Sequence, residues 1–138
     1  MWTYEQSTGN LLHDSSQIGV GYSGHGPGVN NPALESIPDE GPIPEGLYEI
    51  GHPVNTTSHG PFVMPLTPDS SNEMHGRSGF LIHGDEVSHP GEELASLGCI
   101  VLSHPLRSQI WTSGDHQLRV ISGVSAPVTA PVPAPTSA

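Results

Sequence analysis

Basic residues are nearly missing from this chain of 138 residues. It has three arginines and no lysine, against 14 acidic residues, and its formal net charge is −11 with histidine neutral. Proteins that bind nucleic acids or anionic membranes without sequence preference need clustered cationic side chains. The charge balance therefore argues against both kinds of partner. It leaves Arg77, Arg107 and Arg119 as the only arginine or lysine side chains that can attract a substrate carboxylate.

Cysteine and long apolar runs are scarce as well. The single cysteine, Cys99, cannot form a disulfide within the chain. No apolar run approaches the length of a transmembrane helix, and the first ten residues are polar and turn-rich, unlike a secretion signal. We therefore expect a protein that is made in the cytoplasm without an ordinary signal peptide and does not insert into a membrane.

Glycine and proline are abundant instead, with 17 and 15 residues. They interrupt the chain too often for long helices, which favours a mainly β fold with short strands and one short helix. The length suits one domain with one core. We predict that domain at residues 1–123, followed by a Pro/Ala-rich flexible tail at residues 124–138.

Apolar alternation and turn residues locate the expected elements. A hairpin is predicted near the N-terminus. The segment 104–111 is the one expected helix, because Pro105 suits a first turn and Leu106 and Ile110 share a face. Pro65 is expected to break the strand in which it lies. The segment 18–32 is expected to start as a strand and to run into an irregular loop. The other expected strands cover residues 2–6, 11–14, 47–50, 60–68, 79–84, 99–102 and 116–123.

The segment "GFLIHGDEVSHPGEELASLGC" joins a strand ending in His83 to Cys99, sixteen residues later. A neighbouring imidazole can activate a thiol that is otherwise mostly protonated at neutral pH. Gly98 permits a tight backbone approach and lets nearby amides point at a developing oxyanion. The spacing is equally compatible with a buried structural sulfur beside an unrelated histidine, so the residues alone leave both interpretations open.

Several separated motifs, in order, resemble one family. "WTYEQSTGNL", "GYSGHGPGVNNP", "GPIPEGLYEIG", "GRSGFLIHGD" and "SLGCIVLS" resemble the type VI secretion L,D-transpeptidase effectors, and the likeness covers about residues 2–121. The resemblance implies a compact L,D-transpeptidase-like β-sandwich. It also implies a cysteine L,D-carboxypeptidase or L,D-transpeptidase that acts on peptidoglycan stem peptides and needs no cofactor or metal.

The family pattern implies a role for each matching residue. His83 matches the catalytic histidine, and Ser96, Gly98 and Cys99 match the Ser-x-Gly-Cys element. By resemblance, Cys99 attacks the carbonyl between meso-diaminopimelate and the terminal D-alanine of a tetrapeptide stem, with His83 as base and then as acid. Hydrolysis of the resulting thioester leaves a tripeptide. Aminolysis by a free D-amino acid exchanges the terminal residue instead.

The chain departs from the family at Val101, where housekeeping members often carry arginine. Recognition of the substrate carboxylate must then come from another residue. Arg77 is the first candidate, provided that the chain bends at Gly79. Arg107 is the second, with stacking on Trp111 as a structural alternative.

Tyr22 and His75 are two further candidates for binding substrate. Tyr22 lies in the glycine-rich segment "GYSGHGPGVNNP", and His75 comes just before "GRSGF". A segment of this kind can line a cleft or merely fit beneath neighbouring strands. Both interpretations stay open for Tyr22 and for its neighbours Ser23 and His25, and His75 is expected at most to flank the site.

The resemblance also implies a biological setting. A secretion machine would deliver the protein as an antibacterial effector to the periplasm of a target bacterium. There it would remove the tetrapeptide donors that the cell needs for cross-linking. A periplasmic immunity protein would protect the producer from incoming copies.

Two other functions compete with this one. Nine histidines allow a zinc peptidoglycan hydrolase with His75, His83, Asp85 and His89 as ligands, although no compact H-E-x-x-H motif is present. A non-catalytic, cell-wall-binding β module is the second alternative, and its cysteine would be unreactive. A chelator should leave a cysteine enzyme active, and alkylation with iodoacetamide should inactivate it, so these two treatments distinguish a cysteine enzyme from both alternatives.

Overall fold

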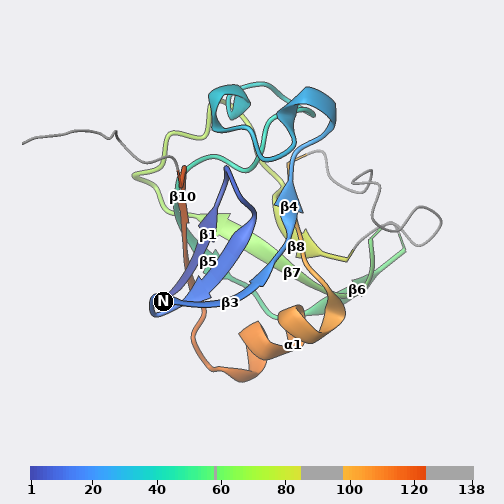
Figure 1. Ribbon diagram of the computed structural model, residues 1–138. Coiled ribbons are helices and arrows are strands. Elements are labelled where there is room, and N and C mark those ends of the chain that lie inside the picture. The colour runs from blue at the N-terminus through green and yellow to red at the C-terminus, as the bar shows by residue number, and fades with distance from the viewer. Residues whose placement is uncertain (58, 85–97, 124–138) are drawn as a thin grey trace, which may run out of the picture.

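The computed structural model describes residues 1–57, 59–84 and 98–123 of the chain. In these ranges the protein is mainly β with one α-helix, which confirms the predicted fold class (Figure 1). Two single-turn 3₁₀ helices, η1 (Gly26–Gly28) and η2 (Pro32–Leu34), were not expected. The other elements are β1 (Trp2–Glu5), β2 (Asn10–His13), β3 (Ser16–Val20), β4 (Tyr22–Ser23), β5 (Gly46–Ile50), β6 (Val54–Thr56), β7 (Gly60–Pro68), β8 (Leu81–His83), β9 (Ile100–Val101), α1 (His104–Thr112) and β10 (Gln117–Ile121).

The strands form one continuous mixed sheet that folds back on itself. Their order is β3-β2-β1-β10-β5-β7-β8-β9-β4, with β6 paired to β7. β3 and β4 are at opposite ends of this order, yet only Gly21 separates them in the chain. A side chain at Gly21 would overlap the Val101 carbonyl oxygen, so glycine permits the close approach that brings the two ends together. The predicted sandwich is thus a single sheet enclosing its own core.

Pro65 does not break its strand, contrary to the prediction. β7 runs unbroken for nine residues, and Pro65 pairs with Leu81 of β8. Proline has no backbone N–H to donate, but the neighbouring groups make the hydrogen bonds that hold β7 in place. The Pro65 carbonyl accepts from the Gly51 N–H at 2.7 Å, and the Leu66 N–H donates to the Phe80 carbonyl at 3.0 Å. β7 can therefore join β5 on one side to β8 on the other.

The core lies inside the folded sheet, and buried residues alternate with more exposed ones along β1 and β10. The N-terminal hairpin forms as predicted, and β1 also pairs in parallel with β10 near the other end of the domain. α1 starts with Pro105 in its first turn, as expected, and buries Ile110 against the core. Each fully buried aliphatic side chain contributes about 1.5–3 kcal/mol. The fully buried side chains are Trp2, Tyr4, Leu11, Ile43, Tyr48, Ile50, Met64, Ile82, Ile100, Leu102, Ile110 and Leu118.

No helix in the described ranges is long and apolar enough to cross a bilayer, since α1 has only nine residues. The predicted tail at residues 124–138 lies outside the described residues.

Candidate active site

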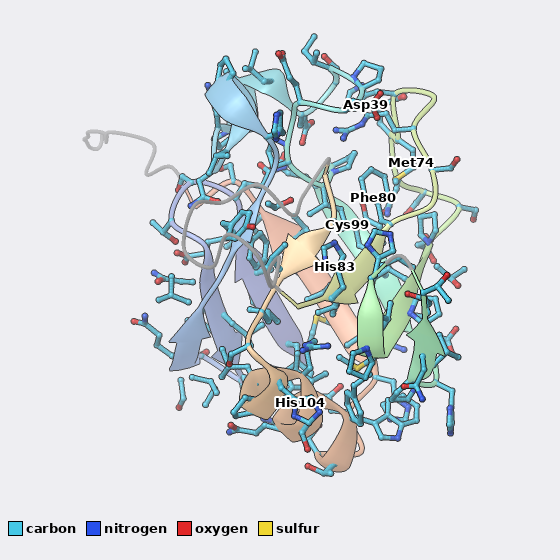
Figure 2. All side chains as sticks on the ribbon, turned by 90° about the vertical axis from the view of Figure 1, so that its right-hand side faces the viewer. Asp39, Met74, Phe80, His83, Cys99 and His104 are labelled. Carbon is cyan, nitrogen blue, oxygen red and sulfur yellow. The ribbon has the colours of Figure 1, made fainter. Side chains whose placement is uncertain are left out.

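The pairing of β8 with β9 brings the histidine and the cysteine to neighbouring strands. These strands are parallel, with Ile82 opposite Ile100 and His83 opposite Val101. Cys99 immediately precedes β9, and its Sγ accepts a hydrogen bond from the Leu81 N–H at 3.3 Å. This register puts Cys99 and His83 on one face of the sheet. Standard strand spacings imply a distance of about 8 Å between their Cα atoms. Figure 2 shows both side chains at these neighbouring strands.

The His83 ring is held from two sides. Its Nδ1 lies 2.8 Å from the Gly84 carbonyl oxygen, which can only accept, so Nδ1 carries the proton. Its face stacks on the His59 ring, with centroids 4.5 Å apart and planes inclined by 29°. The side chain is 2% exposed. This tautomer leaves Nε2 as the basic nitrogen, which is the form that a general base requires.

The Cys99 thiol is a poor nucleophile until a base takes its proton. Burial raises the pKa of the thiol above its ordinary value, while the Leu81 N–H and the nearby Arg77 charge partly oppose that rise. A raised pKa means that the protonated thiol is the main form of this side chain at neutral pH.

The ionisation of Cys99 gives a direct prediction. Because the pKa of the thiol is raised, the rate of iodoacetamide alkylation should keep rising through pH 9 instead of levelling off near neutrality. The measurement is the alkylation rate of Cys99 from pH 5 to 10, followed by intact mass. A plateau already reached below pH 7 would show a stable thiolate and contradict this assignment.

Gly98 turns the backbone sharply just before the cysteine. Its φ of +136° lies in a region that glycine adopts readily and other residues rarely do. A Cβ at this position would overlap Arg77 Nη2 and come within 3.0 Å of Phe80 Cε1. The Gly98 carbonyl oxygen accepts a hydrogen bond of 2.8 Å from the Ser23 hydroxyl. Contacts at both the Cα and the carbonyl thus fix the peptide that leads into Cys99.

Arg77 lies against this turn and not along a strand. The chain bends at Gly79, whose φ is +79°, and this bend brings the guanidinium back over the Phe80 ring at 5.1 Å. Arg77 is 9% exposed and donates to the carbonyl oxygens of Glu35 at 2.6 Å, Pro42 at 2.9 Å and Gly41 at 3.0 Å. These contacts hold the 35–42 loop next to Gly98. Binding of a substrate carboxylate by Arg77 stays a prediction.

Arg107 is built into the scaffold in a similar way. Its Nε donates to the Leu102 carbonyl at 3.1 Å, and its Nη1 donates to the carbonyls of Pro61 at 2.8 Å and Phe62 at 2.9 Å. The side chain is 5% exposed. Trp111, the stacking partner considered for Arg107, stacks on His116 with centroids 4.0 Å apart. Arg107 therefore ties α1 and the end of β9 to the start of β7, and a role in substrate binding stays a prediction.

Replacing Arg107 by methionine should mainly destabilise the fold. Three carbonyls lose a charged donor, and we expect the free energy of unfolding to fall by about 3 kcal/mol. Urea unfolding followed by tryptophan fluorescence measures this loss. Arg119→Met is the matched control, since Arg119 is exposed on β10. Unchanged stability together with a raised KM for a tetrapeptide substrate would instead assign Arg107 to substrate binding.

The other candidate residues have clear positions. Tyr22 of β4 is opposite Val101, so it belongs to the same row of residues as His83, and it is 7% exposed. His75 is partly buried, and its Nε2 lies 3.1 Å from Glu35 Oε2. Substrate binding by Tyr22 and His75 stays a prediction. Ser96 lies outside the described residues.

The zinc alternative receives no support from the described part of the chain. Asp85 and His89 lie outside it, and His75 contacts Glu35. Within the described ranges, one group of three potential ligands has its atoms within 4.8 Å of one another: His13, Asp14 and Asp115. Both carboxylates of that group also pair with the Met1 ammonium, which accounts for their closeness without an ion.

A comparison with protein families decides the relationship. Residues 18–124 match the model of the Tlde1 domain, which covers more than half of the chain. The chain belongs to the Tlde1 domain family. No curated protein matches the sequence. The Tlde1 family consists of type VI L,D-transpeptidase effectors, so membership indicates a type VI effector with L,D-transpeptidase-like activity on peptidoglycan, directed at the cell wall of a target bacterium.

Three contacts of this Tlde1 domain site were not predicted from the sequence. Ser23 holds the Gly98 carbonyl, His59 stacks on His83, and the Gly84 carbonyl accepts from the His83 ring. The motif "GYSGHGPGVNNP" made Ser23 itself a candidate for lining a cleft, but its partner Gly98 was not predicted. His59 carries no local signal, because its role depends on how β7 folds beside β8.

Proposed function

We propose that the protein is a cysteine L,D-carboxypeptidase or L,D-transpeptidase that acts on tetrapeptide stems of peptidoglycan. The main support is the parallel register of β8 and β9, which puts the single cysteine and a histidine of defined tautomer on one face of neighbouring strands. Membership in the Tlde1 domain family supports the substrate class.

The reaction starts with attack by Cys99 on the carbonyl between meso-diaminopimelate and the terminal D-alanine. His83 Nε2 takes the thiol proton as the new C–S bond forms, which compensates for the raised pKa of the partly buried thiol. Backbone N–H groups around Gly98 and Cys99 hold the oxyanion. The intermediate then collapses with cleavage of the C–N bond. His83 returns the proton to the departing D-alanine amine, and a thioester remains on Cys99.

The thioester has two fates. Water, with His83 as base, releases a tripeptide stem and restores the thiol. A free D-amino acid can attack instead through its amine, which gives a tetrapeptide with an exchanged terminal residue. Either product removes a donor for cross-linking, and this supports an antibacterial role in the periplasm of the target cell. A producing cell would then need a periplasmic immunity protein.

The experiment is to incubate the purified protein with tetrapeptide muropeptides, with and without a D-amino acid, and to weigh the products. We expect tripeptide in the first case and an exchanged tetrapeptide in the second, in proportions that report how water and amine compete. Protein alkylated beforehand with iodoacetamide is the control and should leave the tetrapeptide intact. Turnover that survives alkylation but stops with a chelator would support the zinc alternative. An unaltered tetrapeptide in every sample would support the non-catalytic module.

A further inference from the structure

Ser23 links the nucleophile turn to a buried part of the scaffold. Its side chain is completely buried, its hydroxyl donates to the Gly98 carbonyl oxygen at 2.8 Å, and it accepts from the Ile43 N–H at 2.9 Å. The two partners lie in different loops, and Gly98 is 75 residues from Ser23 in the sequence. A buried hydroxyl that both donates and accepts has one favoured orientation, so the position of the Gly98 oxygen is closely defined.

Ser23 is itself held in place. Its backbone N–H donates to Asn30 Oδ1 at 3.2 Å, and its carbonyl accepts from the Asn30 N–H at 2.9 Å. β4, which contains Ser23, pairs with β9 directly after the nucleophile, with Ser23 opposite Ile100. The hydroxyl is therefore presented from a strand that is fixed on two sides.

The geometry of a peptide bond carries this constraint to Cys99. In a trans peptide the C=O and the following N–H lie in one plane and point in opposite directions. Because the Gly98 oxygen is directed at Ser23, the Cys99 N–H is directed away from Ser23. Arg77 and Phe80 lie so close to Gly98 that a side chain at this position would overlap them, so the turn has little free space around it.

We propose that Ser23 is a positioning residue that sets the orientation of the Cys99 N–H as an oxyanion donor. This inference rests on the proposed function, since an oxyanion forms only if Cys99 attacks a carbonyl. Ser23 acts through the Gly98 carbonyl, because its completely buried hydroxyl is hydrogen-bonded there and to the Ile43 N–H. Without its hydroxyl the peptide can rotate, and the donor loses the preorganisation on which oxyanion stabilisation depends.

The test compares two reactions of the same sulfur in the Ser23→Ala variant. Acyl transfer from a tetrapeptide passes through an oxyanion, whereas alkylation by iodoacetamide does not. We expect kcat for the tetrapeptide to fall about 100-fold, as for the loss of one oxyanion donor, with KM within about threefold of wild type. The alkylation rate should stay within about twofold, because the thiol keeps its surroundings.

Two further variants separate positioning from folding. Ser103→Ala is the matched control, since Ser103 is exposed and its side chain makes no capping hydrogen bond to α1. It should behave like wild type in both reactions. Ser23→Thr keeps a hydroxyl at the same position and should turn over at least about tenfold faster than Ser23→Ala. Thermal unfolding by tryptophan fluorescence sets an assay temperature at which every variant is folded.

The outcomes distinguish this inference from the function on which it rests. Unchanged turnover in Ser23→Ala, or turnover and alkylation reduced by the same factor, would overturn the positioning role while leaving the proposed function intact. Equal losses in Ser23→Ala and Ser23→Thr would also overturn it. A folded wild-type protein that alkylates normally but never turns over a tetrapeptide would instead contradict the proposed function.

Discussion

Replacing Cys99 by alanine is expected to abolish turnover of tetrapeptide stems, with a loss of at least about 10³-fold. Cys99 is the one cysteine of the chain, so no second thiol can take its place. The fold should survive, because the removed sulfur is only partly buried and leaves a small space, at a cost of about 1 kcal/mol. Muropeptide products and urea unfolding, measured on the same sample, check both parts.

Cys99→Ser is the companion variant. A serine keeps the shape of the side chain, but its hydroxyl is far less acidic than a thiol, so His83 cannot activate it comparably. We expect turnover to be lost here too, with the fold unchanged. Full activity in either variant would remove Cys99 from the reaction and return attention to the zinc hydrolase.

Replacing His83 by glutamine is expected to lower turnover by about 10²–10⁴-fold, the range of general acid–base catalysis. Glutamine is a neutral polar side chain of similar length that cannot act as a base, so the fold should be retained even though its amide does not coincide with the Nδ1 that faces Gly84. Alkylation of Cys99 should change little, since burial and not His83 is what raises the pKa of the thiol. The variant therefore separates proton transfer from exposure of the sulfur.

The matched control is His104→Gln on the exposed start of α1, where the ring contacts only Phe62 among the aromatic residues that the structure describes. It should keep nearly full turnover. Steady-state kinetics of both variants with one tetrapeptide provide the comparison. Equal, small effects in His83→Gln and His104→Gln would show that His83 is a structural histidine.

Local sequence patterns predict the elements of this fold well. Alternation locates β1, β2, β5, β8 and β10, and Pro105 marks the start of α1, because these signals depend on neighbouring residues. The strand order is not visible in the same way. Trp2 pairs with Leu118, and Gly21 joins the two ends of the sheet, through contacts that leave no periodic pattern.

In the candidate site, too, the local motif is predictable from the sequence and the long-range contacts are not. The motif around His83 and Cys99 predicts which side chains carry the chemistry, and the sheet register brings them to neighbouring strands. The surroundings were less predictable. The bend at Gly79 was considered from the sequence, but the contact of Arg77 with Gly98 was not, and it depends on two glycines with positive φ, Gly76 and Gly79, that turn the chain back. Ser23 meets Gly98 only after β4 has joined β9.

The most direct measurement of the central claim is the mass of the protein during turnover. A tetrapeptide mixed with the protein and quenched in acid within seconds should yield an adduct equal to the stem without its terminal D-alanine. Peptide mapping should place this adduct on Cys99, and a D-amino acid should shorten its lifetime. Product formation with an unmodified thiol at every time point would contradict a thioester at Cys99 and, with it, this account of the site.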